Sequence, residues 1–190
     1  MTSSNAIQQT ENITNGVNVD QVMSVIDSIE DDPNFAKWQI RAHNNWIDGG
    51  LNRSRVKDFS VGGREDDTRT ETFVLDSDEP LPMSGKDSAP NAMEFVLHAL
   101  ASCLTSTLVY HAAVRGIEIE AVESNFEGDL DVRGLLGLSE EVRKGFNKVR
   151  VNMRVKSTAA VEELRELALF SPVYDIVSKS LPVEFVLEKQ

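Results

Sequence analysis

The sequence predicts an α+β fold with mostly antiparallel strands and a buried central helix. Two segments, 36–42 and 148–156, alternate strictly between apolar and polar residues, as half-buried strands do. Between them, 92–114 is apolar or small at nearly every position, and a helix that is hydrophobic all round is buried on all sides. The order of strands, helix, strands, two helices and a last strand favours the α+β class.

The N-terminal end is predicted to be a disordered tail over 1–17. This stretch is rich in Ser, Thr, Asn and Gln and has little to bury. We expect a single domain over 18–190, which is long enough to bury a substantial core. Asn18 is placed to cap a first helix, whose helical apolar spacing runs to Ile29 and stops at Asp31-Asp32-Pro33.

A hairpin and a third strand are expected next. The strand 36–42 leads to a turn at Asp48-Gly49-Gly50, and a return strand follows over about 51–61. A third strand, 69–75, precedes the loop 76–90, which contains three of the six prolines.

The helix over 92–114 is the central element of the predicted fold. Gly116 is placed to stop it. Its apolar surface is hard to cover with the few strands of one subunit, so we expect an intimate homodimer.

The C-terminal part is predicted to return to strands and then to form two helices. Strands are expected at 117–121 and 148–156, with a loop-like stretch of four glycines over 128–145 between them. A helix follows over about 159–170, with Thr158 as its candidate cap.

A further helix is expected to open at Ser171-Pro172, because Ser is a preferred N-cap and Pro a preferred first helical residue. Pro182 ends it, and 183–187 is predicted to form a last strand.

The overall composition narrows the classes of function. A net charge of −12 argues against nucleic-acid partners and anionic membranes, because both attract basic surfaces. We find no stretch that approaches the roughly 20 apolar residues of a membrane span, and no signal peptide, so the cytoplasm is the expected location. A single cysteine excludes a disulfide framework and a Cys-rich metal site, and three scattered histidines make no metal site; we expect no cofactor.

Several stretches carry a resemblance to a known family. The most specific ones are Pro90-Asn91-Ala92-Met93-Glu94-Phe95, Leu97-His98-Ala99-Leu100-Ala101-Ser102-Cys103-Leu104-Thr105, Tyr110-His111-Ala112-Ala113, Arg115-Gly116-Ile117, 127–138 and Ser171-Pro172-Val173-Tyr174-Asp175. Through their order and spacing, roughly 35–187 resembles the OsmC/Ohr family, whose members are dimers of antiparallel sheets wrapped around central helices.

The resemblance implies a chemistry based on thiols. In the peroxidase members, a cysteine of the central helix attacks a hydroperoxide, and a second cysteine at the start of a later helix resolves the sulfenic acid as a disulfide. Cys103 matches the first cysteine. Ser171 stands at the position of the second, so this sequence looks like a branch that lacks it.

The family also holds its thiolate with a glutamate and an arginine. Glu94 matches the glutamate, with Met93 as the other register. A straight helix would place Glu94 opposite Cys103, so contact needs a bent helix start or the other subunit. The arginine is sought near the first hairpin; we choose Arg55, with Arg53 as the next candidate. Arg41, also considered, lies on the polar face of its strand.

Two principal functions are therefore open. The first is a thiol-dependent hydroperoxide reductase for oxidative stress defence, with Cys103, Glu94 and Arg55 as catalytic residues, an organic hydroperoxide as substrate and an external thiol as reductant. The alternative is a non-catalytic OsmC-like dimer that binds a small apolar or anionic ligand at its interface. A purely structural or regulatory dimer is the third possibility.

Overall fold

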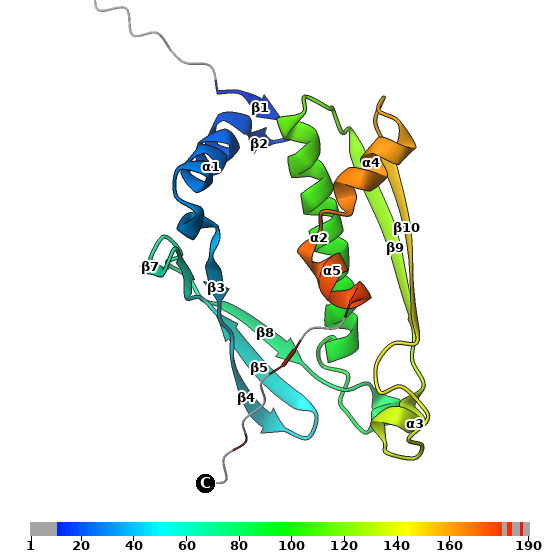
Figure 1. The fold of residues 1–190 in the computed structure, drawn as a ribbon. Helices are drawn as coiled ribbons and strands as arrows, with labels where there is room; N and C mark the ends of the chain where they lie inside the picture. Colours follow the sequence, from blue (N-terminus) through cyan, green and yellow to red (C-terminus); the bar gives the residue numbers. More distant parts are fainter. Residues whose placement is uncertain (1–10, 180–181, 184–186, 188–190) are drawn as a thin grey trace, which may run out of the picture. The chain divides into compact units, whose positions relative to one another are not determined.

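The computed structural model describes residues 11–179, 182–183 and 187, and it shows an α+β protein with antiparallel sheets, as predicted (Figure 1). The chain divides into two compact units, 1–95 and 96–190, which are described separately below. The boundary falls inside the long helix α2, Ala92–Val114. That the two units form a single domain stays a prediction.

The first unit begins with a short hairpin. Strand β1, Ile13–Thr14, pairs antiparallel with β2, Val17–Asn18, across a turn at Asn15 and Gly16, which both have positive φ. Val17 is buried. The predicted tail over 1–17 is therefore too long: Asn-Gly is a preferred two-residue hairpin turn, and this turn brings the residues after it into ordered structure. Residues 1–10 lie outside the described residues.

Helix α1, Val19–Asp31, follows as predicted. The side chain of Asn18 caps it by accepting a hydrogen bond from the backbone N–H of Gln21 at 2.9 Å. Pro33 then opens a single 3₁₀ turn, η1 (Pro33–Ala36), where the sequence pattern predicted the start of a strand.

Two three-stranded sheets replace the predicted hairpin and third strand. One sheet has the order β3-β6-β7 (Trp38–Ile40, Phe59–Val61 and Arg64–Asp66), and the other has the order β4-β5-β8 (His43–Asp48, Leu51–Val56 and Phe73–Ser77). The turn at 48–50 is confirmed. The return strand predicted over 51–61 is divided between the two sheets. Its first part, β5, pairs with β4, and its last part, β6, pairs with β3.

The half-buried strand expected over 36–42 corresponds to β3, which is instead exposed. Every residue of β3 and β4 is exposed, including Trp38 at 57%, Ile40 at 74% and Trp46 at 74%. Strand β7 was not predicted. It follows β6 after a turn at Gly62 and Gly63, which both have positive φ, and pairs with it antiparallel. The unit therefore presents large apolar side chains that its own described residues leave uncovered.

A buried carboxylate organises the loop between β8 and α2. Asp78 is 2% exposed, and its oxygens accept hydrogen bonds from the backbone N–H groups of Glu79, Lys86 and Ser88 and from the Ser88 hydroxyl, at 2.8–3.2 Å. These bonds hold the pKa of Asp78 below its ordinary value; the Ser88 hydroxyl is the largest cause. They close the loop, which contains the 3₁₀ turn η2 (Leu81–Met83).

Replacing Asp78 should therefore destabilise the protein in a pH-dependent way. Asp78→Asn loses acceptor capacity and should lower the melting temperature at pH 7, whereas exposed Asp67→Asn should not. Because the folded pKa is depressed, the contribution of the carboxylate is complete above the ordinary value of 3.8 and is lost as the pH falls through the folded pKa. Melting curves recorded between pH 2 and 7 should show the gap between wild type and variant closing below that value. A gap independent of pH would contradict this role.

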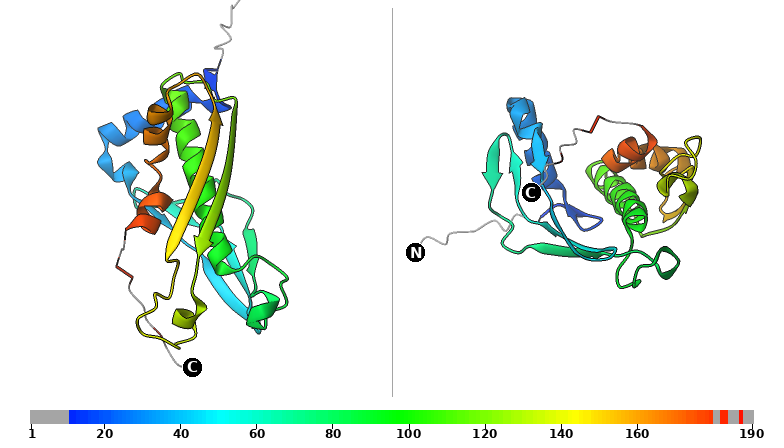
Figure 2. Two further views of the ribbon diagram at one scale, coloured as in Figure 1. Left: turned by 90° about the vertical axis from the view of Figure 1, so that its right-hand side faces the viewer. Right: turned by 90° about the horizontal axis from the view of Figure 1, so that it is seen from below.

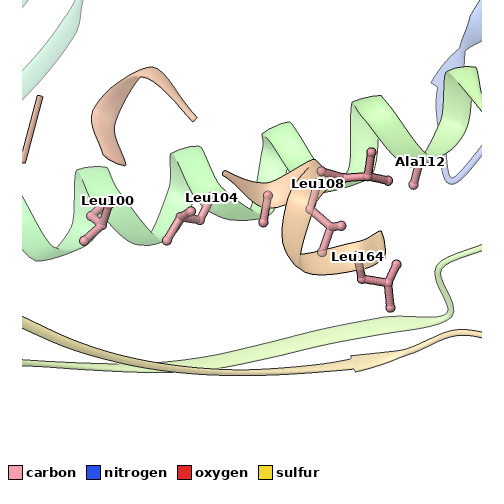
Figure 3. Packing of buried hydrophobic residues seen from close by; sticks show 7 residues of the cluster. Leu100, Leu104, Leu108, Ala112 and Leu164 are labelled. Carbon is pink, nitrogen blue, oxygen red and sulfur yellow. The ribbon is translucent and has the colours of Figure 1, made fainter. Parts of the chain in front are cut away.

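The second unit packs α2 against one ribbon and two short helices. Strand β9, Ala121–Asp129, pairs antiparallel with β10, Lys148–Lys156, and the ribbon runs along α2 (Figure 2). Helices α4, Val161–Ala168, and α5, Pro172–Ser178, complete the layer (Figure 1). The core is formed by buried residues of α2 and α4: Leu100, Leu104, Leu108, Ala112, Leu164, Leu167 and Ala168 (Figure 3). Apolar residues of the ribbon and of α5 pack against this core.

Several predicted boundaries in this unit shift. The strand expected at 117–121 begins only at Ala121, and β9 continues to Asp129 into the glycine-rich stretch. That stretch also contains the short helix α3, Val132–Leu135, where a Cβ on Gly134 would lie 2.6 Å from the carbonyl oxygen of Arg143. Its glycine permits this close backbone approach.

The C-terminal boundaries shift as well. Ala160 rather than Thr158 occupies the N-cap position of α4, and it makes no side-chain capping hydrogen bond. Helix α5 ends at Ser178, before Pro182, and the strand predicted over 183–187 falls largely outside the described residues.

Helix α2 has the predicted bounds, but only one side of it is buried. Its buried residues are Leu100, Leu104, Leu108, Ala112 and Ala113. The expectation of burial all round is therefore wrong for the single chain. By length and composition alone, α2 is also long and apolar enough to cross a membrane. The expectation that no segment approaches a membrane span is therefore wrong, although the core helix of a soluble protein passes the same test. It is the one such helix among the described residues.

Candidate active site around Cys103

The side chains of α2 fall into stripes with a spacing of four residues, and these stripes determine where the thiol lies. One stripe is buried in the core (Leu100, Leu104, Leu108 and Ala112). A second is polar and exposed (Glu94, His98, Ser102, Ser106 and Tyr110). Cys103 belongs to a half-buried stripe between them, with Thr107 and His111. The thiol therefore lies at the edge of the core.

The nearest polar neighbour of the thiol is a hydroxyl on the next turn. Cys103 Sγ lies 3.9 Å from Thr107 Oγ1, and either atom can donate. Cys103 is about three turns into α2, too far for the positive end of the helix dipole to act on it. A cation that favours the thiolate must therefore come from elsewhere.

A shallow hollow of about 490 Å³ begins at Thr107 and continues along the same side of α2. Its walls come from α2 and from the start of α5: Ser106, Thr107, Tyr110, His111, Phe170 and Pro172. Because Phe170 and Pro172 flank Ser171, the hollow places the start of α5 beside the stripe that carries the thiol. Sequence reasoning did not identify this hollow, although the spacing of Cys103, Thr107 and His111 already indicated a shared stripe.

His111 is held as a neutral donor at the far end of this hollow. Partial burial lowers its pKa, and the positive charge of Arg115 lowers it further. Arg115 Nη1 lies 3.1 Å from His111 Nδ1, and since arginine only donates, Nδ1 accepts and the ring proton is on Nε2. The ring stacks on Phe170 with centroids 4.5 Å apart. His111 can therefore offer a hydrogen bond to a molecule in the hollow.

Glu94, the predicted catalytic glutamate, caps the start of α2. Its Oε2 accepts a hydrogen bond from the N–H of Asn91 at 2.8 Å, while Asn91 Oδ1 accepts from the N–H groups of Met93 and Glu94 at 2.9 Å. This reciprocal pair is a capping box. Since α2 is continuous from Ala92, the bent helix start that could have brought Glu94 to Cys103 is not present. Among the described residues Glu94 forms no ion pair with an arginine, so its role in orienting one stays a prediction.

Ser171, at the position of the family's second cysteine, is a structural cap. It is 1% exposed, and its hydroxyl accepts a hydrogen bond from the N–H of Tyr174 at 3.1 Å. This confirms the predicted N-cap before Pro172. The site therefore keeps the helix start of the two-cysteine pattern and lacks its second sulfur.

The three arginines considered from the sequence lie in the first unit and have different partners. Arg41 pairs with Glu65, and Arg53 forms two hydrogen bonds with Asp76, at 2.6 and 2.7 Å. The guanidinium of Arg53 holds the pKa of Asp76 below its ordinary value. Arg55 donates a hydrogen bond to the amide oxygen of Asn45 at 3.3 Å, and its charge helps to lower the pKa of Asp76 after the larger effect of Arg53. Of these three arginines, Arg55 is the one that forms no direct ion pair with a described carboxylate.

No group of three or more His, Cys, Asp or Glu side chains among the described residues is arranged to hold a metal ion.

The fold and the site define an α+β protein whose long apolar helix carries a single half-buried thiol. The sequence profile described as OsmC-like protein matches residues 85–186, more than half of the chain. The chain therefore belongs to the OsmC-like family, as its resemblance predicted. No curated protein sequence matches it significantly.

Solved structures show the same fold at low sequence identity. An OsmC-like protein from Mycoplasma pneumoniae is 14% identical, with a TM-score of 0.54, and the match covers 75% of this chain and 89% of that one. A protein from Psychrobacter arcticus, provisionally described as an osmotic stress induced and detoxification response protein, is 13% identical, with a TM-score of 0.52 and coverage of 70% and 85%. A protein from Legionella pneumophila, described as an organic hydroperoxide resistance protein, is 20% identical with coverage of 73% and 88%, but its TM-score of 0.47 adds nothing to the comparison of folds.

Proposed function

We propose that the protein is a thiol-dependent hydroperoxide reductase with Cys103 as its single peroxidatic cysteine. The observation that carries this proposal is the position of the thiol. Cys103 is half-buried on α2, within the region that matches the OsmC-like family, and a hollow begins at its neighbour Thr107. A thiol in this position is protected from bulk solvent and still open to a small substrate.

The reaction uses the thiolate as nucleophile. The sulfur attacks one oxygen of the hydroperoxide; the S–O bond forms as the O–O bond breaks, and the alkoxide leaves and takes up a proton. Sulfur is oxidised by two electrons to a sulfenic acid, and the hydroperoxide is reduced to an alcohol. One external thiol then forms a mixed disulfide and releases water, and a second thiol restores Cys103 and leaves as the external disulfide.

Arg55 is proposed as the cation that favours the thiolate. A positive charge beside a sulfur stabilises its ionised, nucleophilic form. Arg41 and Arg53 are already paired with Glu65 and Asp76, so neither offers an unneutralised charge. Arg55 forms no direct ion pair with a described carboxylate, so its charge is less fully neutralised than theirs.

The experiment measures consumption of cumene hydroperoxide with a dithiol or a monothiol as reductant. Wild type should turn over with either reductant, and Cys103→Ser should fall to the rate without protein, because no other sulfur nucleophile of this kind exists in the chain. Arg55→Met should slow the reaction, and Arg53→Met is its matched control on the same strand. Equal rates for wild type and Cys103→Ser would reject the proposal.

We also propose that the protein is a homodimer. Large apolar side chains are exposed on the strands of the first unit, among them Trp38, Ile40, Trp46 and Phe73. Exposed apolar surface of this extent marks an interaction face. Light scattering at micromolar concentration should give twice the chain mass of 21.1 kDa. A mass of one chain would reject the dimer and, with it, a site shared between subunits.

A further inference from the structure

The second unit contains a further opening, on the core side of α2, that does not include Cys103. It is a groove of about 380 Å³, a volume typical of small-molecule sites. Its walls come from α2, β10, α4 and α5: Leu104, Leu108, Val151, Met153, Val155, Val161, Leu164, Arg165, Ala168, Leu169 and Tyr174. Figure 3 shows how Leu104, Leu108 and Leu164 lie between the two helices and the ribbon.

One positive charge lies in this apolar lining. Among the described residues that line the groove, Arg165 is the one that carries a charge, and Tyr174 adds a hydroxyl. The acidic residues of α4 (Glu162, Glu163 and Glu166) are not part of the lining. No carboxylate of the described chain forms an ion pair with Arg165. This contrasts with Arg150 and Arg154 of β10, whose partners are carboxylates of β9.

We propose that this groove binds an amphipathic carboxylate of medium chain length. The hydrocarbon chain lies against the leucines of α2 and the apolar face of β10, where burial of apolar surface favours binding. The carboxylate pairs with Arg165, and the Tyr174 hydroxyl supplies a second donor. In a protein with a net charge of −12, an arginine without an acidic partner offers a favourable place for an anion. This site is separate from the proposed peroxidase site.

The probe for the test is decanoate, with decanol and decylamine as uncharged and cationic counterparts. The protein has five methionines, and among those that the structure describes only Met153 lines the groove, so its labelled methyl group reports occupancy by NMR. Decanoate should shift the Met153 signal, which Met153→Leu assigns, and leave the Met83 and Met93 signals in place. Calorimetry should rank decanoate above decanol, and decanol above decylamine. Cys103→Ser should bind decanoate as wild type does, so that this test stands apart from the peroxidase test.

Two variants test the charge. Arg165→Gln should weaken decanoate binding by about fivefold, the size of a partly exposed ion pair, and leave decanol unchanged. Val161→Glu should act similarly, because it places a carboxylate four residues before Arg165, where the two can pair, and a glutamate suits the first turn of a helix. Arg154→Gln, on the other face of β10, is the control. The proposal is overturned if decanoate leaves the Met153 signal unshifted, or if Arg165→Gln binds decanoate as tightly as wild type does. It is also overturned if the groove is a contact between copies of the chain. That outcome would appear as a changed oligomer mass for Arg165→Gln, with no binding of decanoate.

Discussion

Substoichiometric cumene hydroperoxide should convert Cys103 of the wild-type protein into a sulfenic acid that persists. The chain contains no other cysteine that could condense with it, so no internal disulfide can form. Ser171 occupies the cap where the second sulfur would stand, and its hydroxyl does not resolve a sulfenic acid. A sulfenic-acid probe should label Cys103, as read by intact mass, and excess peroxide should drive the sulfur to the irreversible sulfinic state.

The matched variant is Ser171→Cys. A thiol at this helix start lies beside the stripe of Cys103, because Phe170 and Pro172 line one hollow with Thr107. Oxidation should then give an intrachain disulfide, seen as the loss of two hydrogens in the intact mass, provided that the two Cβ atoms approach to about 3.5–4.5 Å. If wild-type Cys103 stays unmodified while an OsmC-type peroxidase reacts under the same conditions, the catalytic proposal fails. The ligand-binding alternative then becomes the better account.

Leu108→Ala should cause the largest loss of stability of any single truncation in the second unit. Leu108 is completely buried at the centre of the cluster formed by α2 and α4 (Figure 3). Removing its side chain leaves a cavity in a packed core and should lower the free energy of unfolding by about 3–5 kcal/mol. In a chain of this length, that loss corresponds to a fall of roughly 10 °C in melting temperature.

The control is Val161→Ala at the start of α4. Val161 is 73% exposed, so its truncation should change the free energy of unfolding by no more than about 0.5 kcal/mol. Denaturant titration measures both variants. Equal destabilisation by the two would mean that the cluster around Leu108 is not the core of this unit.

The helices could be predicted closely because their signals are local. The bounds of α2 and the caps at Asn18 and Ser171 follow from residues within one or two turns. The strands were harder, since their pairing depends on distant partners. The pattern over 51–61 is continuous, but β6 pairs with β3 and β5 pairs with β4. Alternation in β3 predicted a half-buried strand, and it cannot tell whether the cover comes from the same chain.

The same distinction applies to the candidate site. Cys103 was predicted from its helix and from the resemblance, whereas the capping role of Glu94 was not predicted. The choice among the arginines could not be made from the sequence. It depends on a pair such as Arg53 and Asp76, which are 23 residues apart and meet only when β5 pairs with β8. The hollow at Thr107 likewise needs α5 to be folded back on α2.

The stripes of α2 make the number of its residues as important as their identity. One residue inserted after Cys103 would rotate the preceding part of the helix by about 100° relative to the part that follows. Leu100 would then leave the line of Leu104 and Leu108, and the thiol would leave the line of Thr107 and His111. A substitution on the exposed stripe changes one side chain. An insertion or deletion instead changes which residues of α2 face the core and which face solvent. The spacing between Cys103 and the core leucines of α2 therefore determines the side of the helix on which the thiol lies.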